Sequence, residues 1–450
     1  MLGTEKLYTA EQTRALDHCA IHDHRVPGIT LMSRAASAAF RCLLDTWPAP
    51  EHIQILCGTG NNGGDGFLMA DLAHKRGIPV TVLQLGDAAK ISGDALLARG
   101  QAQSNGVKIV PFAEASLLPL GVIVDAMLGT GLGGDVRGVY LEAIEAVNSC
   151  GAAVLAVDIP SGLCADTGRV LGAAVRADLT VTFIGLKRGL FTLDAADYTG
   201  ALQFSDLEVP SEIYAQVASD CSRLELEPLV EALPSRPAVA HKGLYGSVWV
   251  GGGDHGRAAA AARAAEAALR CGAGLVRVAP RPEHVAALVA RTPEVMSHGV
   301  SSGDDFKPLL ESADILVVGP GLGQSPWSQH LLQLATASGK PVVLDADGLN
   351  LLATGEHVTD SCRDNWVLTP HPGEAARLLG CTTGEVQGDR FAAVQALQRR
   401  YGGVVVLKGN GSLIADSEQR LLSDYGNPGM ASGGMGDVLS GVIGSLLAQH

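Results

Sequence analysis

The feature that most constrains the fold of this chain is a repeated alternation of short apolar runs, glycine-rich loops and helical segments. In the first half, apolar runs at 52–57, 80–85 and 153–158 have the length of buried strands, and residues 67–76 have helical spacing. The same alternation restarts near residue 247. Strands that alternate with helices predict a parallel, doubly wound sheet with helices on both faces. The sequence therefore predicts an α/β fold made of two three-layer domains.

A proline-rich segment separates the two alternating halves. Residues 208–237 contain four prolines and several acids, and they break the rhythm of strands and helices. We therefore predict one domain at 1–217 and a second at 218–450. The last residues before His450 have helical character, so we expect the second domain to be truncated at its C-terminus.

Composition excludes several classes of partner. A net charge of -14 argues against nucleic-acid binding. No apolar stretch approaches the ~20 residues that a membrane helix needs. The nine cysteines are an odd number without a CxxC motif, as expected of reduced thiols in a cytoplasmic protein.

The polar, glycine-rich loops of the first half all follow predicted strands. They read GTGNNGGDG at 58–66, DAMLGTGLGGD at 125–135 and DIPSGLCADTG at 158–168. In parallel sheets ligands bind at the carboxyl ends of the strands, so we expect a site where these loops meet. The glycines at the start of the first loop match GxGxxG, which alone is a weak dinucleotide signal.

Three oxygen-bearing side chains in these loops suit a hard cation. Asn62, Asp125 and Ser161 each lie at the end of a different strand. Together they offer amide, carboxylate and hydroxyl or carbonyl oxygens. Roles in turns account for Asn62 and Ser161 individually about as well.

Asp158 is the candidate for proton transfer in the first half. It ends an apolar strand and borders the expected pocket. The alternative is that it caps the turn at Pro160 and Ser161. Lys187 follows another strand and faces either the same pocket or solvent.

The second half ends in a glycine-rich turn that runs into an apolar helix, NPGMASGGMGDVLSG at 427–441. Such a turn leaves backbone N–H groups free at the positive end of the helix, which makes a phosphate site. Asp437 lies just inside this helix, where a carboxylate would repel the bound anion. It either takes a proton from a substrate hydroxyl or is a first-turn acid stabilised by the dipole.

Further loops of the second half point to a nucleotide. Residues 408–412, KGNGS, supply a cation and backbone donors for phosphate. His371 lies between two prolines and either touches the ligand or caps the next helix. For Asp345 and Asp347, a catalytic or metal-linked role and a turn role stay open.

These motifs resemble those of the bifunctional NAD(P)H-hydrate repair enzymes over nearly the whole chain. The three loops of the first half are similar to their N-terminal, Rossmann-like domain. The second half is similar to their C-terminal, ribokinase-like domain, and the shared segments are HKGLYGSVWVGGG, LRCGAGLVRVA, GPGLG, DADGLN, TPHPGEAARLLG, LKGNGS and NPGMASGGMGDVLSG.

The resemblance implies two activities. The N-terminal domain would interconvert the R and S hydrates of NADH and NADPH (NADHX and NADPHX) at C6 of the nicotinamide ring. The C-terminal domain would dehydrate the S form with ADP, giving AMP and phosphate. Potassium and magnesium are implied cofactors, and we expect a cytoplasmic homo-oligomer.

The resemblance also implies roles for individual residues. Asp158 and Asp437 would be catalytic, and Asn62, Asp125 and Ser161 would bind potassium. The residues expected to contact the hydrate in the first domain are Asn61, Asn62, Gly63, Gly64, Asp65, Gly129, Thr130, Gly131, Leu132, Gly133, Gly134 and Asp135. In the second domain the hydrate would also contact Gly321, His371 and Asp437, and the residues expected to hold the adenine nucleotide are Lys408, Gly409, Asn410, Gly411, Ser412 and Gly436.

Three other functions compete with this one. A small-molecule kinase would share the second domain and Asp437, but the GNNGGDG domain argues against a plain kinase. A binding module would share the first domain, although the loss of Asp125 or Asp158 would be expected there, and both are present. A plain NAD dehydrogenase fits less well, because no ribose-binding acid follows the glycine loop in the usual context.

Overall fold

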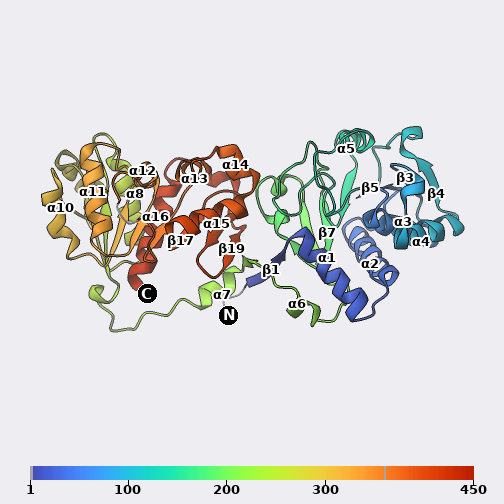
Figure 1. Cartoon of the computed structure of the whole chain (residues 1–450), viewed down its shortest axis with the longest axis horizontal. Helices are drawn as coiled ribbons and strands as arrows, with labels where there is room; N and C mark the ends of the chain where they lie inside the picture. Colours follow the sequence, from blue (N-terminus) through green and yellow to red (C-terminus); the bar gives the residue numbers. More distant parts are fainter. Residues whose placement is uncertain (1–3, 359–360) are drawn as a thin grey trace. The chain divides into compact units, whose positions relative to one another are not determined.

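The computed structural model describes residues 4–358 and 361–450, which form two compact units (Figure 1). The N-terminal unit is Thr4–Arg223, and the C-terminal unit begins at Leu224. Each contains a mostly parallel sheet, which confirms the predicted α/β class. The division lies a few residues beyond the boundary expected after residue 217.

The N-terminal unit has a seven-stranded sheet in the order β4-β3-β2-β5-β6-β7-β9. All neighbouring pairs are parallel. The order reverses between β2 and β5, which is where ligands bind in doubly wound sheets. The strands are β2 (Ile53–Cys57), β3 (Val80–Gln84), β4 (Lys108–Pro111), β5 (Val122–Ala126), β6 (Ala153–Val157), β7 (Leu179–Phe183) and β9 (Ala201–Ser205). Outside this sheet β1 (Thr4–Tyr8) pairs in parallel with β8 (Leu186–Lys187), and β10 (Cys221–Leu224) lies on its other side.

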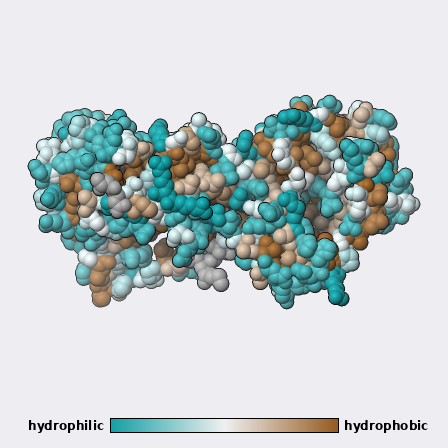
Figure 2. All heavy atoms as spheres, viewed as in Figure 1, coloured by the Kyte–Doolittle hydropathy of each residue, from teal (hydrophilic) through white to brown (hydrophobic). Residues whose placement is uncertain are grey.

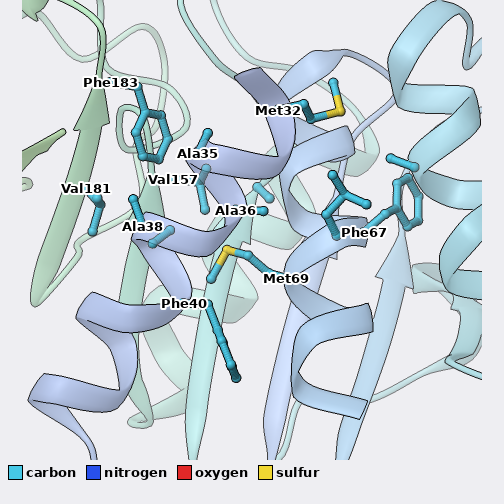
Figure 3. Close-up of a cluster of buried hydrophobic side chains, with 14 of the residues drawn as sticks. Met32, Ala35, Ala36, Ala38, Phe40, Phe67, Met69, Val157, Val181 and Phe183 are labelled. Atoms are coloured by element: carbon cyan, nitrogen blue, oxygen red, sulfur yellow. The ribbon is translucent and has the colours of Figure 1, made fainter. Parts of the chain in front are cut away.

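Helices cover both faces of this sheet. One face carries α2 (Gly28–Thr46), α3 (Asn61–Lys75) and α4 (Gly93–Ser104), and the other carries α5 (Val139–Cys150). Alternate residues of β6 pack on opposite layers: Leu155 with the first group and Val154 with α5. Figure 3 shows Ala35 and Ala38 of α2 beside Phe183 and Val181 of β7. The remaining helices of this unit are α1 (Ala10–His18) and α6 (Ile213–Gln216).

One local expectation is wrong. The segment 58–66 is not a loop throughout, because α3 already begins at Asn61. Glycines are poor helix formers, so the sequence favours a loop. Here tertiary contact decides: a Cβ at Gly63 would lie 2.2 Å from the carbonyl oxygen of Gly58. Glycine therefore lets the first turn of α3 rest directly on the end of β2.

The sheet of the C-terminal unit is parallel from β13 to β17 and ends in two antiparallel pairs. Its order within this unit is β13-β12-β11-β14-β15-β16-β17-β18-β19. The strands are β11 (Ser247–Gly251), β12 (Leu275–Ala279), β13 (Met296–Ser297), β14 (Ile315–Val318), β15 (Val342–Leu344), β16 (Trp366–Leu368), β17 (Val404–Leu407), β18 (Ser412–Ala415) and β19 (Arg420–Ser423).

This sheet is also covered on both faces. On one face Val317 packs with the alanines of α8 (Ala258–Arg270), and α16 (Met435–Gln449) lies against α8. On the other face Val318 and Phe306 of α10 (Gly303–Leu310) meet beside Gly251. The remaining helices are α7 (Leu226–Glu231), α9 (Val285–Arg291), α11 (Pro326–Ala337), α12 (Ala346–Thr354), α13 (Pro372–Leu379), α14 (Thr383–Gly388) and α15 (Arg390–Tyr401). The predicted three-layer arrangement is thus present in both units.

Hydrophilic residues cover most of the face shown in Figure 2, in keeping with the net charge of -14. Among the described helices, none combines the length and the apolar character that crossing a bilayer requires.

Candidate functional site

The N-terminal unit contains a cavity of about 580 Å³ at the carboxyl ends of its central strands. Its wall is built from α1, α2, the start of α3, the loop after β5, Asp158 and Lys187. The predicted residues in this wall are Asn61, Asn62, Asp65, Gly129, Thr130, Gly131, Leu132, Gly133 and Asp158. The three loops singled out in the sequence therefore meet at one place.

Four predicted contact residues lie outside the cavity wall. Gly63 faces the backbone of Gly58, and a Cβ at Gly64 would lie 2.6 Å from the Met32 side chain. Both glycines thus serve the packing of α3. Gly134 and Asp135 follow the part of the loop that lines the cavity.

Asp125 and Ser161 form a buried pair beside the cavity. Ser161 donates to Asp125 from its hydroxyl at 2.6 Å and from its backbone N–H at 2.7 Å, and both side chains are fully buried. Burial raises the pKa of Asp125 to about 6, while the bonds from Ser161 oppose this rise. A buried carboxyl held in this way suits a cation that restores the ionised form.

Asn62 is buried, and its amide oxygen and nitrogen find no partner among the described residues. A buried amide without hydrogen bonds costs roughly 1–3 kcal/mol, so it indicates an absent ligand or water. Asp125 lies in β5, the strand next to β2, and Ser161 follows β6, the strand next to β5. The three side chains offer the kind of oxygens that a hard cation binds, and the cation site stays a prediction.

Asp158 and Lys187 form an ion pair in the cavity wall. The Lys187 side chain is 1% exposed, and it also donates to Thr182 Oγ1 and to the carbonyl oxygen of Phe183, both at 2.9 Å. Asp158 adopts a φ of 68°, which is strained for a residue with a side chain. Its carboxylate bonds to Lys187, Thr182 and the N–H of Phe183, so the alternative role in capping the turn at residues 160–161 is not what it does here.

Two more carboxyls share this cavity. Asp17 on α1 lines it together with Asp65. Burial is the main cause that raises the pKa of Asp17, to about 6, with a smaller contribution from Asp158, and Lys187 opposes the shift. Burial also raises the pKa of Asp65 well above its usual range, followed by the charges of Asp158 and Asp17. The sequence analysis missed Asp17, because it lies in no motif, and only its helical spacing from Thr13 and Ile21 marks the wall it shares with them.

In the C-terminal unit the loops after the parallel strands meet around Asp345. This carboxylate is 1% exposed and accepts from Lys408 Nζ and from Ser440 Oγ, both at 2.7 Å. A Cβ at Gly436 would lie 3.3 Å from Lys408 Nζ. The glycine turn before α16 and the lysine after β17 are therefore adjacent, as a phosphate site requires.

The predicted turn into a helix is present: Gly434, with a φ of 98°, precedes α16, and Asp437 lies in its first turn. Asp437 accepts from Arg263 Nε at 3.2 Å. Burial raises the pKa of Asp437, and Arg263 opposes the rise. Arg263, on α8, has no motif that would have revealed it in the sequence.

His371 caps α13, which is one of the two alternatives considered. The Nδ1 atom of His371 accepts a hydrogen bond from the backbone N–H of Gly373 at 3.0 Å. The backbone N–H of His371 donates to the carboxylate of Glu374 at 2.8 Å. Burial and then the charge of Lys408 lower the pKa of His371. The ring is about half exposed, with Nε2 3.4 Å from Glu374 Oε1, so its edge is also open to a ligand.

The turn at 408–412 is stabilised by a hydrogen bond within it and by hydrogen bonds from Arg390 of α15. Ser412 Oγ donates to the carbonyl oxygen of Gly409 at 3.0 Å. Beneath the turn, buried Arg390 donates to the carbonyl oxygens of Leu407, Lys408 and Gly411 at 3.2–3.4 Å. Arg390 is a second residue that sequence reasoning missed, and it fixes the turn's backbone.

Gly321 ties two neighbouring loops together. Its carbonyl oxygen accepts from the N–H groups of Gly253 and Asp254, both at 2.9 Å. Asp347 continues this edge by accepting from Arg257 at 3.0 Å and from the N–H of Gly323 at 2.9 Å. Asp347 thus bonds to both neighbouring loops.

No group of three or more histidine, cysteine or acidic side chains suited to a metal occurs in the ranges 4–358 and 361–450. A soft or tightly chelated transition metal therefore has no such cluster here, whereas the Asn62, Asp125 and Ser161 set holds one acid and neutral oxygens, as a monovalent cation prefers.

Two family profiles match the chain. The one described as NAD(P)H-hydrate dehydratase covers residues 248–450, and the one described as YjeF-related protein N-terminus covers residues 28–189. They fall in the C-terminal and the N-terminal unit, respectively.

Curated relatives match over both units. The bifunctional NAD(P)H-hydrate repair enzyme Nnr of Coxiella burnetii is 48% identical over 99% of this chain and 90% of its own length. The enzyme of the same name from Escherichia coli is 46% identical over 94% of this chain and 82% of its own. Among solved structures, the ADP/ATP-dependent NAD(P)H-hydrate dehydratase of Bacillus subtilis is 29% identical, with a TM-score of 0.43 over 50% of this chain and 80% of its own.

We predict that Arg390→Met destabilises the chain by ~1–3 kcal/mol, because it leaves three carbonyl oxygens under the 408–412 turn without their donor. The lower midpoint of urea unfolding measures this loss. Arg390→Lys should rescue it only in part, since the shorter lysine side chain does not carry its ammonium as far as Arg390 Nη2, the atom that donates to all three oxygens. Arg399→Met, at an exposed position nine residues later on the same helix, is the control and should leave the midpoint unchanged.

Proposed function

Since the chain belongs to the family of bifunctional NAD(P)H-hydrate repair enzymes, we propose that the cavity beside Asn62 and Asp158 is its epimerase site and that the turn around Asp437 is its dehydratase site. The chain is an enzyme of metabolite repair, an isomerase in its N-terminal part and a lyase in its C-terminal part. It epimerises the R and S hydrates of NADH and NADPH and dehydrates the S form with ADP. The observation that supports the placement is the convergence of the motif-bearing loops at the strand ends of each unit.

In the epimerase site, residues of the α3 start and the loop at 129–135 would hold the hydrate. Asn61, Asn62 and the glycines that line the cavity offer amides and backbone to the ring and its phosphates. Asp158 stands in the wall with its carboxylate held by Lys187. An ionised carboxylate beside the reacting ring is suited to accept a proton from the hydroxyl at C6.

Asn62, Asp125 and Ser161 would bind potassium. The unpartnered amide of Asn62 and the buried carboxyl of Asp125 carry this assignment. When bound, potassium supplies positive charge beside the cavity and satisfies both groups. The protein residues then orient the start of α3 and the loop after β5 toward the hydrate.

In the dehydratase site, residues 408–412 and Gly436 would hold ADP, whose phosphates meet the N-terminus of α16 and Lys408. Gly321 and His371 would contact the hydrate. Asp437 would take the proton of the C6 hydroxyl as its oxygen attacks the terminal phosphorus of ADP. AMP leaves, and loss of phosphate and of the C5 proton then restores the reduced ring. Magnesium, carried by the nucleotide, neutralises the phosphate charge.

Other features of the protein belong to the same proposal. No disulfide joins the nine cysteines, which all lie within the described residues, and this supports a reducing, cytoplasmic compartment. The substrates are small molecules, and the acidic net charge supports the absence of nucleic-acid partners. A homo-oligomer that does not bind membranes completes the proposal.

The experiment that tests this function mixes both hydrate epimers with ADP, magnesium and potassium. We expect the absorbance of the reduced nicotinamide to recover beyond the share of the S epimer, because the N-terminal unit supplies more S form. If recovery stops at the fraction of hydrate that was in the S form, the epimerase activity is excluded. If no absorbance recovers, both activities are excluded. A phosphorylated hydrate that accumulates would instead support the rival kinase.

Asp437→Asn should lower the rate of dehydration by at least ~10²-fold, because an amide cannot act as base. ADP binding, measured by calorimetry, should stay within a few-fold, and epimerisation should be unchanged. Asp304→Asn, which also removes an acid from the first turn of a helix, in α10, is the control. Burial raises the pKa of Asp437, and only the ionised carboxylate can act as a base. The rate of the wild type should therefore fall as the pH decreases, and this fall should begin at a pH above the usual pKa range of an aspartate. Dehydration that survives in Asp437→Asn would exclude this role.

Asn62→Leu should abolish stabilisation by potassium. A bound cation raises the free energy of unfolding by ~2.7 kcal/mol at a hundred times its dissociation constant. We therefore expect a higher melting temperature in potassium chloride than in choline chloride of equal ionic strength for the wild type and not for this variant. Asn61→Leu should keep the difference, because Asn61 is outside the cation set. Equal melting temperatures of the wild type in both salts would argue against the site.

A further inference from the structure

The epimerase reaction needs two proton-transfer groups. The hydrate carries its hydroxyl on C6, next to N1, so C6 is a hemiaminal carbon. A hemiaminal can invert when the ring opens to an aldehyde and closes again on the other face. Opening requires a base for the hydroxyl proton and an acid for the departing nitrogen. The proposed function names Asp158 alone.

We propose that Asp17 is the second proton-transfer group of the epimerase site, the acid that protonates N1 while Asp158 accepts the hydroxyl proton. This inference rests on the proposed function of the N-terminal unit. It assigns a role to a residue of α1, an element that carries none of the sequence motifs.

Geometry and chemistry support Asp17. It lines the same cavity as Asp158, and its side chain accepts no hydrogen bond from any residue in the described ranges. A half-buried carboxyl that is not used to hold the fold together is available to a ligand. The helix changes to π-helical bonding at Cys19–Asp23 directly after it, and such turns are frequent at functional sites.

The charges of the cavity divide the two roles. Four carboxyls line the cavity, those of Asp17, Asp65, Asp94 and Asp158, together with Arg14 and Lys187, and Lys187 forms an ion pair with Asp158. A carboxylate paired with a cation in this way suits the role of the base. Burial and the negative charge of Asp158 favour the protonated form of Asp17 and raise its pKa to about 6. An acid with a pKa near the working pH transfers protons best, and burial raises the pKa of Asp65 well above its usual range.

The steps balance without any co-reactant. Asp158 takes the hydroxyl proton, the oxygen forms C=O, and the C6–N1 bond breaks with its electron pair going to N1. Asp17 gives N1 its proton. The aldehyde then turns about the C5–C6 bond, and N1 attacks the other face of C6. Asp17 regains its proton from N1, and Asp158 returns its proton to the oxygen.

The test follows conversion of the R hydrate to the S hydrate by chromatography, with the nucleotide omitted so that the C-terminal unit is silent. Asp17→Asn should slow conversion by ~10²-fold relative to wild type. Asp17→Glu should recover part of the rate. Glu11→Gln removes the same charge from the exposed side of α1 and should keep the full rate. The potassium-dependent rise in melting temperature reports that the N-terminal unit of each variant is folded.

The pH profile separates chemistry from structure. The wild-type rate should fall as pH rises through about 6, because the acid form of Asp17 is lost, and this limb should vanish in Asp17→Asn. The charged groups facing Asp17 are Asp65, Asp94, Asp158 and Lys187, with Arg14 on its own helix. Ionisation of Asp125 would strengthen cation binding as the pH rises, which would change the rate in the opposite direction. The assays therefore use a saturating concentration of potassium.

Each outcome decides. A wild type that does not interconvert the epimers overturns the proposed function itself. A wild type that does, with Asp158→Asn inactive and Asp17→Asn fully active, overturns only the role of Asp17. A slow Asp17→Asn that keeps the high-pH limb shows a structural role and also overturns it. If Asp65→Asn removes that limb instead, Asp65 is the acid.

Discussion

Parallel strand pairing is the constraint on which both sites depend. It points the carboxyl ends of β2, β5 and β6 toward one edge, so the residues after these strands meet although they are far apart in the chain. The C-terminal unit has the same parallel arrangement in β11, β14, β15, β16 and β17. In the N-terminal unit the loops that line the cavity gather where the strand order reverses. In both units helices on both faces bury the strands that hold the loops.

Two buried ion pairs lie in the candidate sites. Lys187 is 1% exposed and bonds Asp158, and Asp345 is equally buried and bonds Lys408. Removing one partner of such a pair leaves an uncompensated charge, which costs more than the pair contributes. The arrangement therefore restricts where each carboxylate can point. Function and folding share these residues, so loss of activity in a variant is informative only beside a measure of stability.

The sequence allowed the structure to be predicted best in the segments that carry recognisable motifs. Strand positions, the two α/β layers and the helix that begins beside Asp437 follow from apolar runs and glycine placement. The start of α3 at Asn61 did not, because helix propensity argues against Gly63, Gly64 and Gly66, and only the contact of Gly63 with Gly58 reveals why the helix can begin there. Asp17, Arg263 and Arg390 were missed for a related reason: each acts through partners that are distant in sequence. For Asp437 the sequence left two roles open, a base and an acid stabilised by the helix dipole. The structure adds a partner that the sequence did not reveal, because Arg263 donates a hydrogen bond to this carboxylate.

The two sites differ in charge in the way their reactions require. The cavity proposed as the epimerase site sets four carboxyls against Lys187 and Arg14, which favours shared protons and suits a reaction that only moves protons. Around Asp437 the balance shifts, because Arg263, Lys408 and the N-terminus of α16 all carry positive charge. Such a site attracts the phosphates of a nucleotide, as the proposed dehydratase site requires. Burial raises the pKa of Asp437 and the charge of Arg263 opposes that rise, so the guanidinium favours the ionised carboxylate that the proposed base needs.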